Sequence, residues 1–328
     1  MFMAHGPGAD NLYSQKASFK DNEWAIVLAG GDGTRLRPLT RRIAGDERPK
    51  QFCRILGGET LLEQTSRRIA LAIAPERTLC VLNRAHEPFY SALMSDLAPA
   101  NLVVQPGNRG TAPAILYGLL RVAAFDANAL VALFPSDHYI SDDERFMRHI
   151  RAALDAVRAR PELTVLLGIH PESPEVEYGW IEPAESIFAG EGSRLMGVRR
   201  FWEKPHYALA KELQARGCLW NSFVMIASAR GLLEMIASAV PKVYGAFSRP
   251  GLALGTGRER ETVERLYTRL VESNFSHEVL ALRPDRLAVL RVTGITWNDL
   301  GEPRRVMASL SLAGLRPHWA EAAIAQSA

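Results

Sequence analysis

A glycine-rich turn follows the first apolar run of the chain and has the residue types that bind phosphate. The run Trp24 to Leu28 is typical of a buried parallel strand, and it leads through Ala29 into Gly30-Gly31-Asp32-Gly33. Without a Cβ the backbone can approach a ligand closely, and its N–H groups can cradle phosphates. A Walker loop would need Gly-Lys-Ser/Thr after four spacers, and a dinucleotide fingerprint would need glycine at Leu36. The turn therefore predicts a nucleotide site that is neither a Walker loop nor a dinucleotide-binding site.

Two basic clusters follow the glycines, one around Arg35 and one around Lys50. Arginine offers a bidentate fork to phosphate oxygens and lysine a compact point charge, so together they could neutralise a triphosphate. We expect this role for Arg35 and Lys50 because they flank a glycine turn that follows a strand. For Arg37, Arg41 and Arg42, a basic surface loop is the favoured interpretation.

The strings AGGDGTRLRPLT and PKQF resemble the signature of sugar-nucleotide pyrophosphorylases, most of all that of mannose-1-phosphate guanylyltransferases. The resemblance extends from Trp24 to Glu302. It implies a reaction that joins a sugar 1-phosphate, here mannose 1-phosphate, to a nucleoside triphosphate, here GTP, with loss of pyrophosphate. It also implies that the turn binds the nucleotide through Ala29, Gly30, Gly31, Gly33, Thr34 and Arg35.

A second motif, Gln105-Pro106-Gly107-Asn108-Arg109-Gly110-Thr111, reads as a strand-to-helix connection. Thr111 is predicted to be the N-cap of the following helix, with Pro113 in the first turn. That structural interpretation leaves the side chains of Gln105, Asn108 and Arg109 unexplained, and these would suit a base edge or a sugar. The motif is similar to the family's base-recognition loop, which implies nucleotide contacts from Gln105, Asn108, Gly110 and Thr111.

Two aspartates are candidate metal ligands. Asp137 follows the apolar run Leu130 to Phe134, and Mg²⁺ often takes only one or two protein carboxylates together with substrate phosphates. An Asx turn is the structural alternative. By resemblance to the family's closing motif, Asp299 in Trp297-Asn298-Asp299-Leu300-Gly301 is the second ligand, and the catalytic set is Arg35, Lys50 and Asp137. The neighbouring His138 could orient a side chain or titrate.

The sugar-binding residues follow from the resemblance alone. The strings around Tyr178-Gly179 and Glu203-Lys204-Pro205 are similar to family motifs, and Trp220-Asn221-Ser222 matches an asparagine at a strand start. They imply that the sugar phosphate contacts Gly179, Glu203, Lys204 and Asn221.

Three positions depart from the family pattern, and one nearby residue could compensate. Phe223 stands where glycine is expected, which would narrow the pocket or move the strand edge. Ser276 stands in place of an aspartate and Leu282 in place of a lysine. Glu278 could substitute for the missing carboxylate or be an exposed helical residue.

The rest of the chain alternates strand and helix patterns. Strands are predicted at 78–82, 102–104, 130–134 and 163–169, and helices at 61–73, 111–124, 142–157, 229–239, 259–272 and 304–312. The alternation predicts an α/β fold, a mostly parallel mixed sheet flanked by helices, with ligands at the carboxyl ends of the strands. No hexapeptide repeat follows Trp297, so no C-terminal β-helix is expected.

Composition excludes membrane and disordered classes, with 47% hydrophobic and 23% charged residues and no run of eighteen apolar residues. A formal charge of +3, without aromatics among the basic residues, favours small anions over nucleic acid. Three widely spaced cysteines indicate no disulfide framework and a cytoplasmic location.

We expect a mobile tail at 1–23, a nucleotidyltransferase domain at 24–302 and a helix and tail at 303–328, whose helix could meet a second subunit in a homodimer. Within the domain, residues 24–160 would bind the nucleotide and 161–302 the sugar.

The resemblance and the cations together predict a direct in-line displacement at the α-phosphorus, with no covalent enzyme intermediate. Two alternatives stay open. One is a pyrophosphorylase for another pair, such as glucose 1-phosphate with UTP or dTTP. The other is a regulatory paralogue that binds a nucleotide sugar without turnover.

Overall fold

The computed structural model describes residues 22–190, 193–248 and 253–320 of the 328 in the chain. Most of the tail predicted at 1–23, and the last residues of the tail predicted at 303–328, lie outside these ranges. In the described residues, no helix has both the length and the apolar character that a membrane crossing requires. Cys53, Cys80 and Cys218 are buried free thiols, as their spacing predicted.

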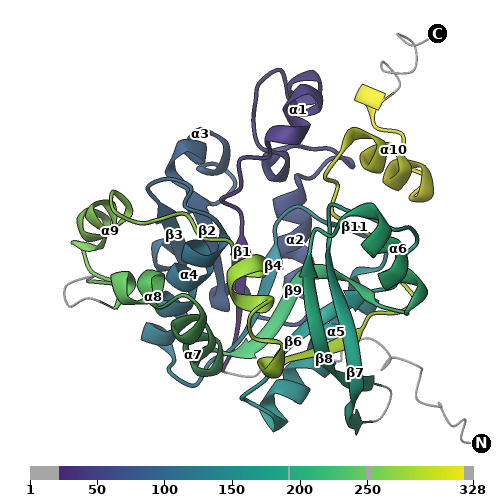
Figure 1. The fold of residues 1–328 in the computed structure, drawn as a ribbon. Coiled ribbons are helices and arrows are strands. Elements are labelled where there is room, and N and C mark those ends of the chain that lie inside the picture. Colours follow the sequence, from purple (N-terminus) through teal and green to yellow (C-terminus); the bar gives the residue numbers. More distant parts are fainter. Residues whose placement is uncertain (1–21, 191–192, 249–252, 321–328) are drawn as a thin grey trace, which may run out of the picture.

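Nine strands form one twisted sheet through the middle of the molecule (Figure 1). Their order across the sheet is β3-β2-β1-β4-β9-β6-β10-β8-β7. The strands are β1 (Glu23–Leu28), β2 (Thr78–Asn83), β3 (Leu102–Gln105), β4 (Leu130–Pro135), β6 (Thr164–Ile169), β7 (Gly179–Gly190), β8 (Ser193–Glu203), β9 (Leu219–Ser228) and β10 (Leu287–Arg291). A separate antiparallel pair joins β5 (Tyr139–Ile140) to β11 (Trp297–Asn298).

The sheet is mixed, with most strands running the same way, as predicted. Strands β3, β2, β1 and β4 pair in parallel, as do β6 and β10. Strand β9 runs antiparallel between β4 and β6, and β8 runs antiparallel between β10 and β7. The carboxyl end of β4 therefore lies beside the start of β9, which brings the two halves of the chain together at one edge.

Helices cover both faces of the sheet (Figure 1). Alternate residues of β1 explain why both faces must be covered: Ala25 and Val27 belong to one buried cluster, and Trp24 and Ile26 to the cluster on the other face. The helices are α1 (Arg37–Ala44), α2 (Leu61–Ile69), α3 (Glu87–Tyr90), α4 (Thr111–Phe125), α5 (Asp143–Ala159), α6 (Tyr207–Ala215), α7 (Ala229–Ala239), α8 (Pro241–Phe247), α9 (Glu259–Tyr267) and α10 (Pro303–Leu312).

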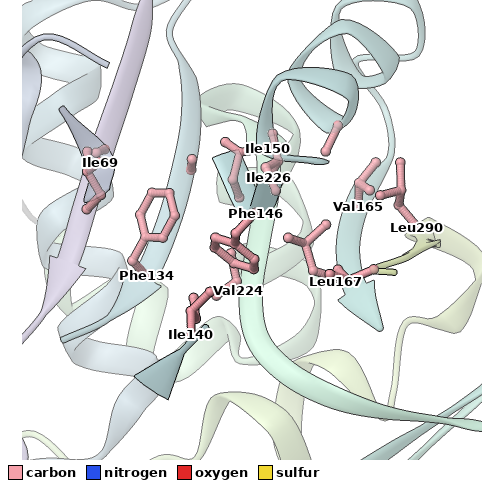
Figure 2. Close-up of a cluster of buried hydrophobic side chains, with 14 of the residues drawn as sticks. Ile69, Phe134, Ile140, Phe146, Ile150, Val165, Leu167, Val224, Ile226 and Leu290 are labelled. Atoms are coloured by element: carbon pink, nitrogen blue, oxygen red, sulfur yellow. The ribbon is translucent and has the colours of Figure 1, made fainter. Parts of the chain in front are cut away.

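Helix α5 packs the first of these clusters against the sheet. Asp142 caps it by accepting a hydrogen bond of 2.8 Å from the Arg145 N–H. The apolar side chains on its inner face are buried, and Figure 2 shows two of them meeting residues of β4, β6 and β9. These are Phe146 and Ile150 of α5 with Phe134, Leu167, Val224 and Ile226.

Three boundary predictions were wrong. Helix α2 ends at Ile69 instead of 73, where the chain turns and Pro75 follows. Helix α9 ends at Tyr267 instead of 272, because the chain then pairs with the loop before α4. Thr111 is the first residue of α4, and the cap position belongs to Gly110, which has no side chain to cap it.

Candidate active site

The glycine turn leaves the carboxyl end of β1 and is fastened on two sides. The Ala29 N–H donates to the Val81 carbonyl at 2.8 Å. The buried side chain of Gln51 donates to the carbonyl oxygens of Ala29 at 3.0 Å and Gly31 at 2.8 Å. A Cβ at Gly30 would lie 2.8 Å from Nε2 of Gln105, so this position needs glycine. The turn is thus held rigidly, with its backbone close to the second motif.

A cavity of about 290 Å³, here the loop cavity, lies between the glycine turn and the second motif. Gln105 is a buried residue in the lining of this cavity, and its Oε1 accepts from the Tyr267 hydroxyl at 3.1 Å. Asn108 donates to the Asp32 carboxylate at 2.9 Å, which links the two loops. Six of the predicted nucleotide contacts line this cavity: Gly30, Gly31, Gln105, Asn108, Gly110 and Thr111.

The second motif is docked onto the segment that follows α9. The Ser273 N–H donates to the Arg109 carbonyl at 3.1 Å, and the Ser273 carbonyl accepts from the Ala112 N–H at 3.1 Å. The Thr111 hydroxyl, which was predicted to cap α4, accepts instead from the Phe275 N–H at 2.8 Å. Gly110 has a φ of 85°, and a Cβ there would lie 2.3 Å from the Ser273 carbonyl oxygen. The docking therefore depends on glycine at this position.

A second cavity, of about 320 Å³, is here called the lysine cavity. Its lining contains Lys50, whose Nζ lies 3.4 Å from Oδ2 of Asp137 and contacts the carbonyl oxygen of Asp299. Arg35 lines the same cavity and is half exposed. The lining brings together these predicted residues: Gly33, Thr34, Arg35, Lys50, Asp137 and Asp299.

Asp299 is fixed in orientation by its Oδ1 atom. That oxygen lies 3.0 Å from the Tyr178 hydroxyl, 2.8 Å from the Gly301 N–H and 2.9 Å from Nη1 of Arg305. Burial acts to raise the pKa of Asp299, but Lys50, His138 and Arg305 outweigh it and hold the pKa below its usual value. The residue is therefore an ionised carboxylate.

His138 lies between Trp297 and Asp137. Its Nδ1 accepts from the Trp297 indole N–H at 3.3 Å, which places the imidazole proton on Nε2, 3.7 Å from Oδ1 of Asp137. Burial lowers the pKa of His138 to about 4, so the ring is neutral at physiological pH. The indole of Trp297 therefore holds the ring beside Asp137, and the two roles considered for His138 stay predictions.

The third cavity, of about 250 Å³, contains three carboxylates and is here called the acidic cavity. These are Glu177, Glu203 and Asp299. Burial raises the pKa of Glu203, although Lys204 and the Ser276 hydroxyl act to lower it. Gly179, Glu203 and Asn221, for which sugar contacts are predicted, line this cavity. Lys204 and Ala29 line none of the three cavities.

Two of the unusual positions belong to this site. Phe223 has a φ of 59°, a left-handed conformation that glycine adopts freely, and it lines both the loop and the acidic cavities. Ser276 begins a short π-helix, Ser276–Leu280, and lines the acidic cavity, where its hydroxyl bonds to Glu203.

Leu282 and the candidate substitute Glu278 lie outside the cavities. The Glu278 carboxylate accepts from the Asn274 N–H at 2.8 Å, so it is bound to the backbone before the π-helix and does not take the place of the missing aspartate. Leu282 is exposed.

The three cavities adjoin. His138 and Asp299 line both the lysine and the acidic cavities, and Thr111, Phe223 and Asn274 line both the acidic and the loop cavities. Within the described residues, no group of three or more His, Cys, Asp or Glu side chains is placed to hold a metal. Two carboxylates beside an open cavity nevertheless fit Mg²⁺, which completes its octahedron with water and phosphate oxygens.

Several site residues were missed from the sequence. Glu177 and Tyr178 belong to a motif in which only Gly179 was given a role, and Asn274 lies at the start of a segment that was read as a departure. Arg305 could have been found, because it lies on the buried face of α10 with Val306, Ser309 and Leu310. A charge on the apolar face of an amphipathic helix requires a buried partner.

Comparison with known proteins gives a match over most of the chain. Residues 24–309 match the family described as Nucleotidyl transferase. The xanthan biosynthesis protein XanB of Xanthomonas campestris pv. campestris (strain B100) is 31% identical over 283 residues, which cover 84% of this chain and 57% of XanB. Mannose-1-phosphate guanylyltransferase of Escherichia coli (strain K12) is 28% identical over 285 residues, 85% of this chain and 58% of the relative. The chain thus spans little more than half the length of these relatives.

A solved structure is similar over most of both chains. The crystal structure of mannose-1-phosphate geranyltransferase from Thermus thermophilus matches with a TM-score of 0.74 and 31% identity. The match covers 88% of this chain and 79% of that one.

Proposed function

This chain belongs to the nucleotidyl transferase family, and from that premise we propose that it transfers a guanylyl group from GTP to mannose 1-phosphate. The products would be GDP-mannose and pyrophosphate. The names of the relatives support the substrate pair: one is mannose-1-phosphate guanylyltransferase, and the solved structure is of a protein named for the same sugar phosphate. The predicted nucleotidyltransferase fold is confirmed by the same structural match.

One observation carries this proposal. Three adjoining cavities lie along the edge of the sheet where β1, β3 and β4 end, and one of them contains a largely buried lysine beside two aspartates. A guanylyl transfer needs adjoining places for a base, for a sugar and for the phosphates with their counter-charges.

We assign the guanosine to the loop cavity, the phosphates to the lysine cavity and the mannose to the acidic cavity. The amides of Gln105 and Asn108 suit the base, and the carboxylate of Glu203 suits sugar hydroxyls. The division into a nucleotide half and a sugar half stays a proposal, since Thr111 of the first half also lines the acidic cavity. The homodimer and the cytoplasmic location stay predictions.

The reaction is an in-line displacement in which a phosphate oxygen of mannose 1-phosphate attacks the α-phosphorus of GTP and pyrophosphate leaves. The attacking oxygen is already anionic and needs no general base, in keeping with the low pKa of His138. Lys50 and Arg35 would hold the phosphates and offset the charge that develops on them. Asp137 and Asp299 would hold Mg²⁺, which when bound neutralises phosphate charge.

The proposal is tested by the release of pyrophosphate from purified protein with Mg²⁺. GTP with mannose 1-phosphate is compared with the other triphosphates and with glucose 1-phosphate. We expect release that requires both GTP and mannose 1-phosphate. Release of pyrophosphate with glucose 1-phosphate and UTP or dTTP would show that these are the substrates instead. Tight binding of a nucleotide sugar without turnover would indicate the regulatory paralogue.

Substitutions in the lysine cavity test the site. Arg35→Ala and Asp137→Ala should each lower turnover by about 10²–10³-fold with an unchanged melting temperature. Arg41→Ala is the matched control, because Arg41 is exposed and pairs with Glu47 outside the cavities. Near-normal turnover in either site variant would contradict the assignment.

A further inference from the structure

Two cations that were predicted to bind phosphate share a single carboxylate oxygen. Oε2 of Glu177 lies 2.9 Å from Nη1 of Arg35 and 3.6 Å from Nζ of Lys204. Arg35 follows the glycine turn, Glu177 precedes β7 and Lys204 follows β8. The contact therefore joins the nucleotide-binding loop to the segments proposed to bind the sugar.

The backbone holds both ends of this contact in place. The carboxylate of Glu175 accepts from the N–H groups of Val176 at 2.9 Å and Glu177 at 3.2 Å. Lys204 has a φ of 46°, although it is not glycine and precedes Pro205. Its N–H donates to the Tyr178 carbonyl at 3.3 Å. A strained conformation that surrounding contacts maintain is common at ligand sites, and here it accompanies the approach of Lys204 to Glu177.

Glu177 lies where a phosphate group would lie between the proposed nucleotide and sugar substrates. Glu177 lines the acidic cavity and Arg35 lines the adjoining lysine cavity. A carboxylate and a phosphate use the same acceptor geometry toward a guanidinium, but the phosphate monoester carries more charge. The side chains of Arg35, Glu177 and Lys204 are exposed by 51%, 36% and 52%, so water screens both ion pairs and the carboxylate can be exchanged for another anion.

We propose that Glu177 occupies, in the empty enzyme, the position of the phosphate group of the sugar 1-phosphate, and that the substrate displaces it. The inference rests on the proposed function for the identity of the sugar phosphate, but not for the presence of an anion site. Until the substrate arrives, the carboxylate keeps Arg35 and Lys204 close to one another. It then competes with the incoming phosphate, so it lowers the affinity for that anion.

The substitution Glu177→Gln removes this competition while keeping the size of the side chain. Its dissociation constants for inorganic phosphate and for mannose 1-phosphate are measured by calorimetry at fixed ionic strength. Exposed ion pairs are weak, so we expect both anions to bind about two- to five-fold more tightly than to the unchanged protein. Glu172→Gln is the control, since Glu172 is exposed in the same loop and its replacement changes the net charge equally. That variant should bind both anions as the unchanged protein does.

Each outcome decides the question. Equal or weaker phosphate binding by a folded Glu177→Gln protein, or no measurable phosphate binding by either protein, would overturn the proposal. So would an equal gain in the Glu172→Gln control, which would indicate a general charge effect. A gain for inorganic phosphate without any binding of mannose 1-phosphate would support the displaced carboxylate and count against the proposed substrate.

Discussion

Replacement of Arg305 by methionine should both destabilise the protein and slow its reaction. Arg305 reaches from α10 into the site, where Nη1 lies 2.9 Å from Asp299 and Nη2 lies 2.6 Å from Glu175. Its guanidinium also lies 4.6 Å from the centre of the Tyr178 ring. Methionine keeps much of the length of the side chain but leaves both carboxylates without their cation.

The size of the expected loss in the free energy of unfolding follows from the burial of Arg305 and its two partners. The side chains of Arg305, Glu175 and Asp299 are only 8%, 13% and 15% exposed, and removal of one partner from a buried pair costs about 3–5 kcal/mol. Asp299 keeps its contacts with Tyr178 and Gly301, so we expect the lower end, about 3 kcal/mol. Turnover should fall about 10–100-fold, as for other residues that orient a metal ligand. Arg305→Lys keeps the charge but not the two-pronged geometry of the guanidinium. Its stability and turnover should therefore lie between those of the unchanged protein and those of Arg305→Met.

The free energy of unfolding is measured by urea denaturation and turnover by pyrophosphate release. Arg304→Met is the control, because the Arg304 side chain is 74% exposed and pairs only with Glu302 among the described ion pairs. We expect that variant to stay within about 0.5 kcal/mol of the unchanged protein. A loss below about 1 kcal/mol for Arg305→Met, or equal losses in the two variants, would refute the reasoning.

Three further predictions concern the backbone and pH. Gly110→Ala should lower the free energy of unfolding by at least about 2 kcal/mol, since alanine disfavours a positive φ and its Cβ would meet Ser273; a loss within about 0.5 kcal/mol in urea denaturation would contradict this. Phe223→Ala should be less stable than Phe223→Gly by about 1 kcal/mol, because only glycine relieves the left-handed strain, and a higher melting temperature for the alanine variant would count against it. Burial lowers the pKa of His86 from 6.5 despite Asp32, so the unfolded chain takes up a proton that the folded chain does not. The free energy of unfolding should therefore fall as the pH drops below 6.5, with a shallower slope in His86→Gln; identical slopes would exclude His86 as a cause.

Local pattern was enough to predict most elements of the sheet and its helices. The inward residues of α5 follow a helical period, and the first strand is apolar over most of its length because both of its faces are covered. Predictions of helix ends failed where a segment distant in the sequence forms a hydrogen bond with a group that was expected to bond within its own helix. Thr111 does not cap α4 because the Phe275 N–H takes its hydroxyl, and α9 stops early because Ser273 pairs with Arg109.

The sequence by itself determined the glycine turn, the order of the strands along the chain and the residue types that we propose bind phosphate, because these depend on neighbours a few positions apart. Only the tertiary structure decided which charges meet. Glu177 is 142 residues from Arg35, and Lys50 lies 249 residues from the carbonyl of Asp299 that it contacts. The physical reason is that the paired strands carry the ends of distant segments to one edge of the sheet, and no periodicity in the chain encodes which side chains then lie within reach.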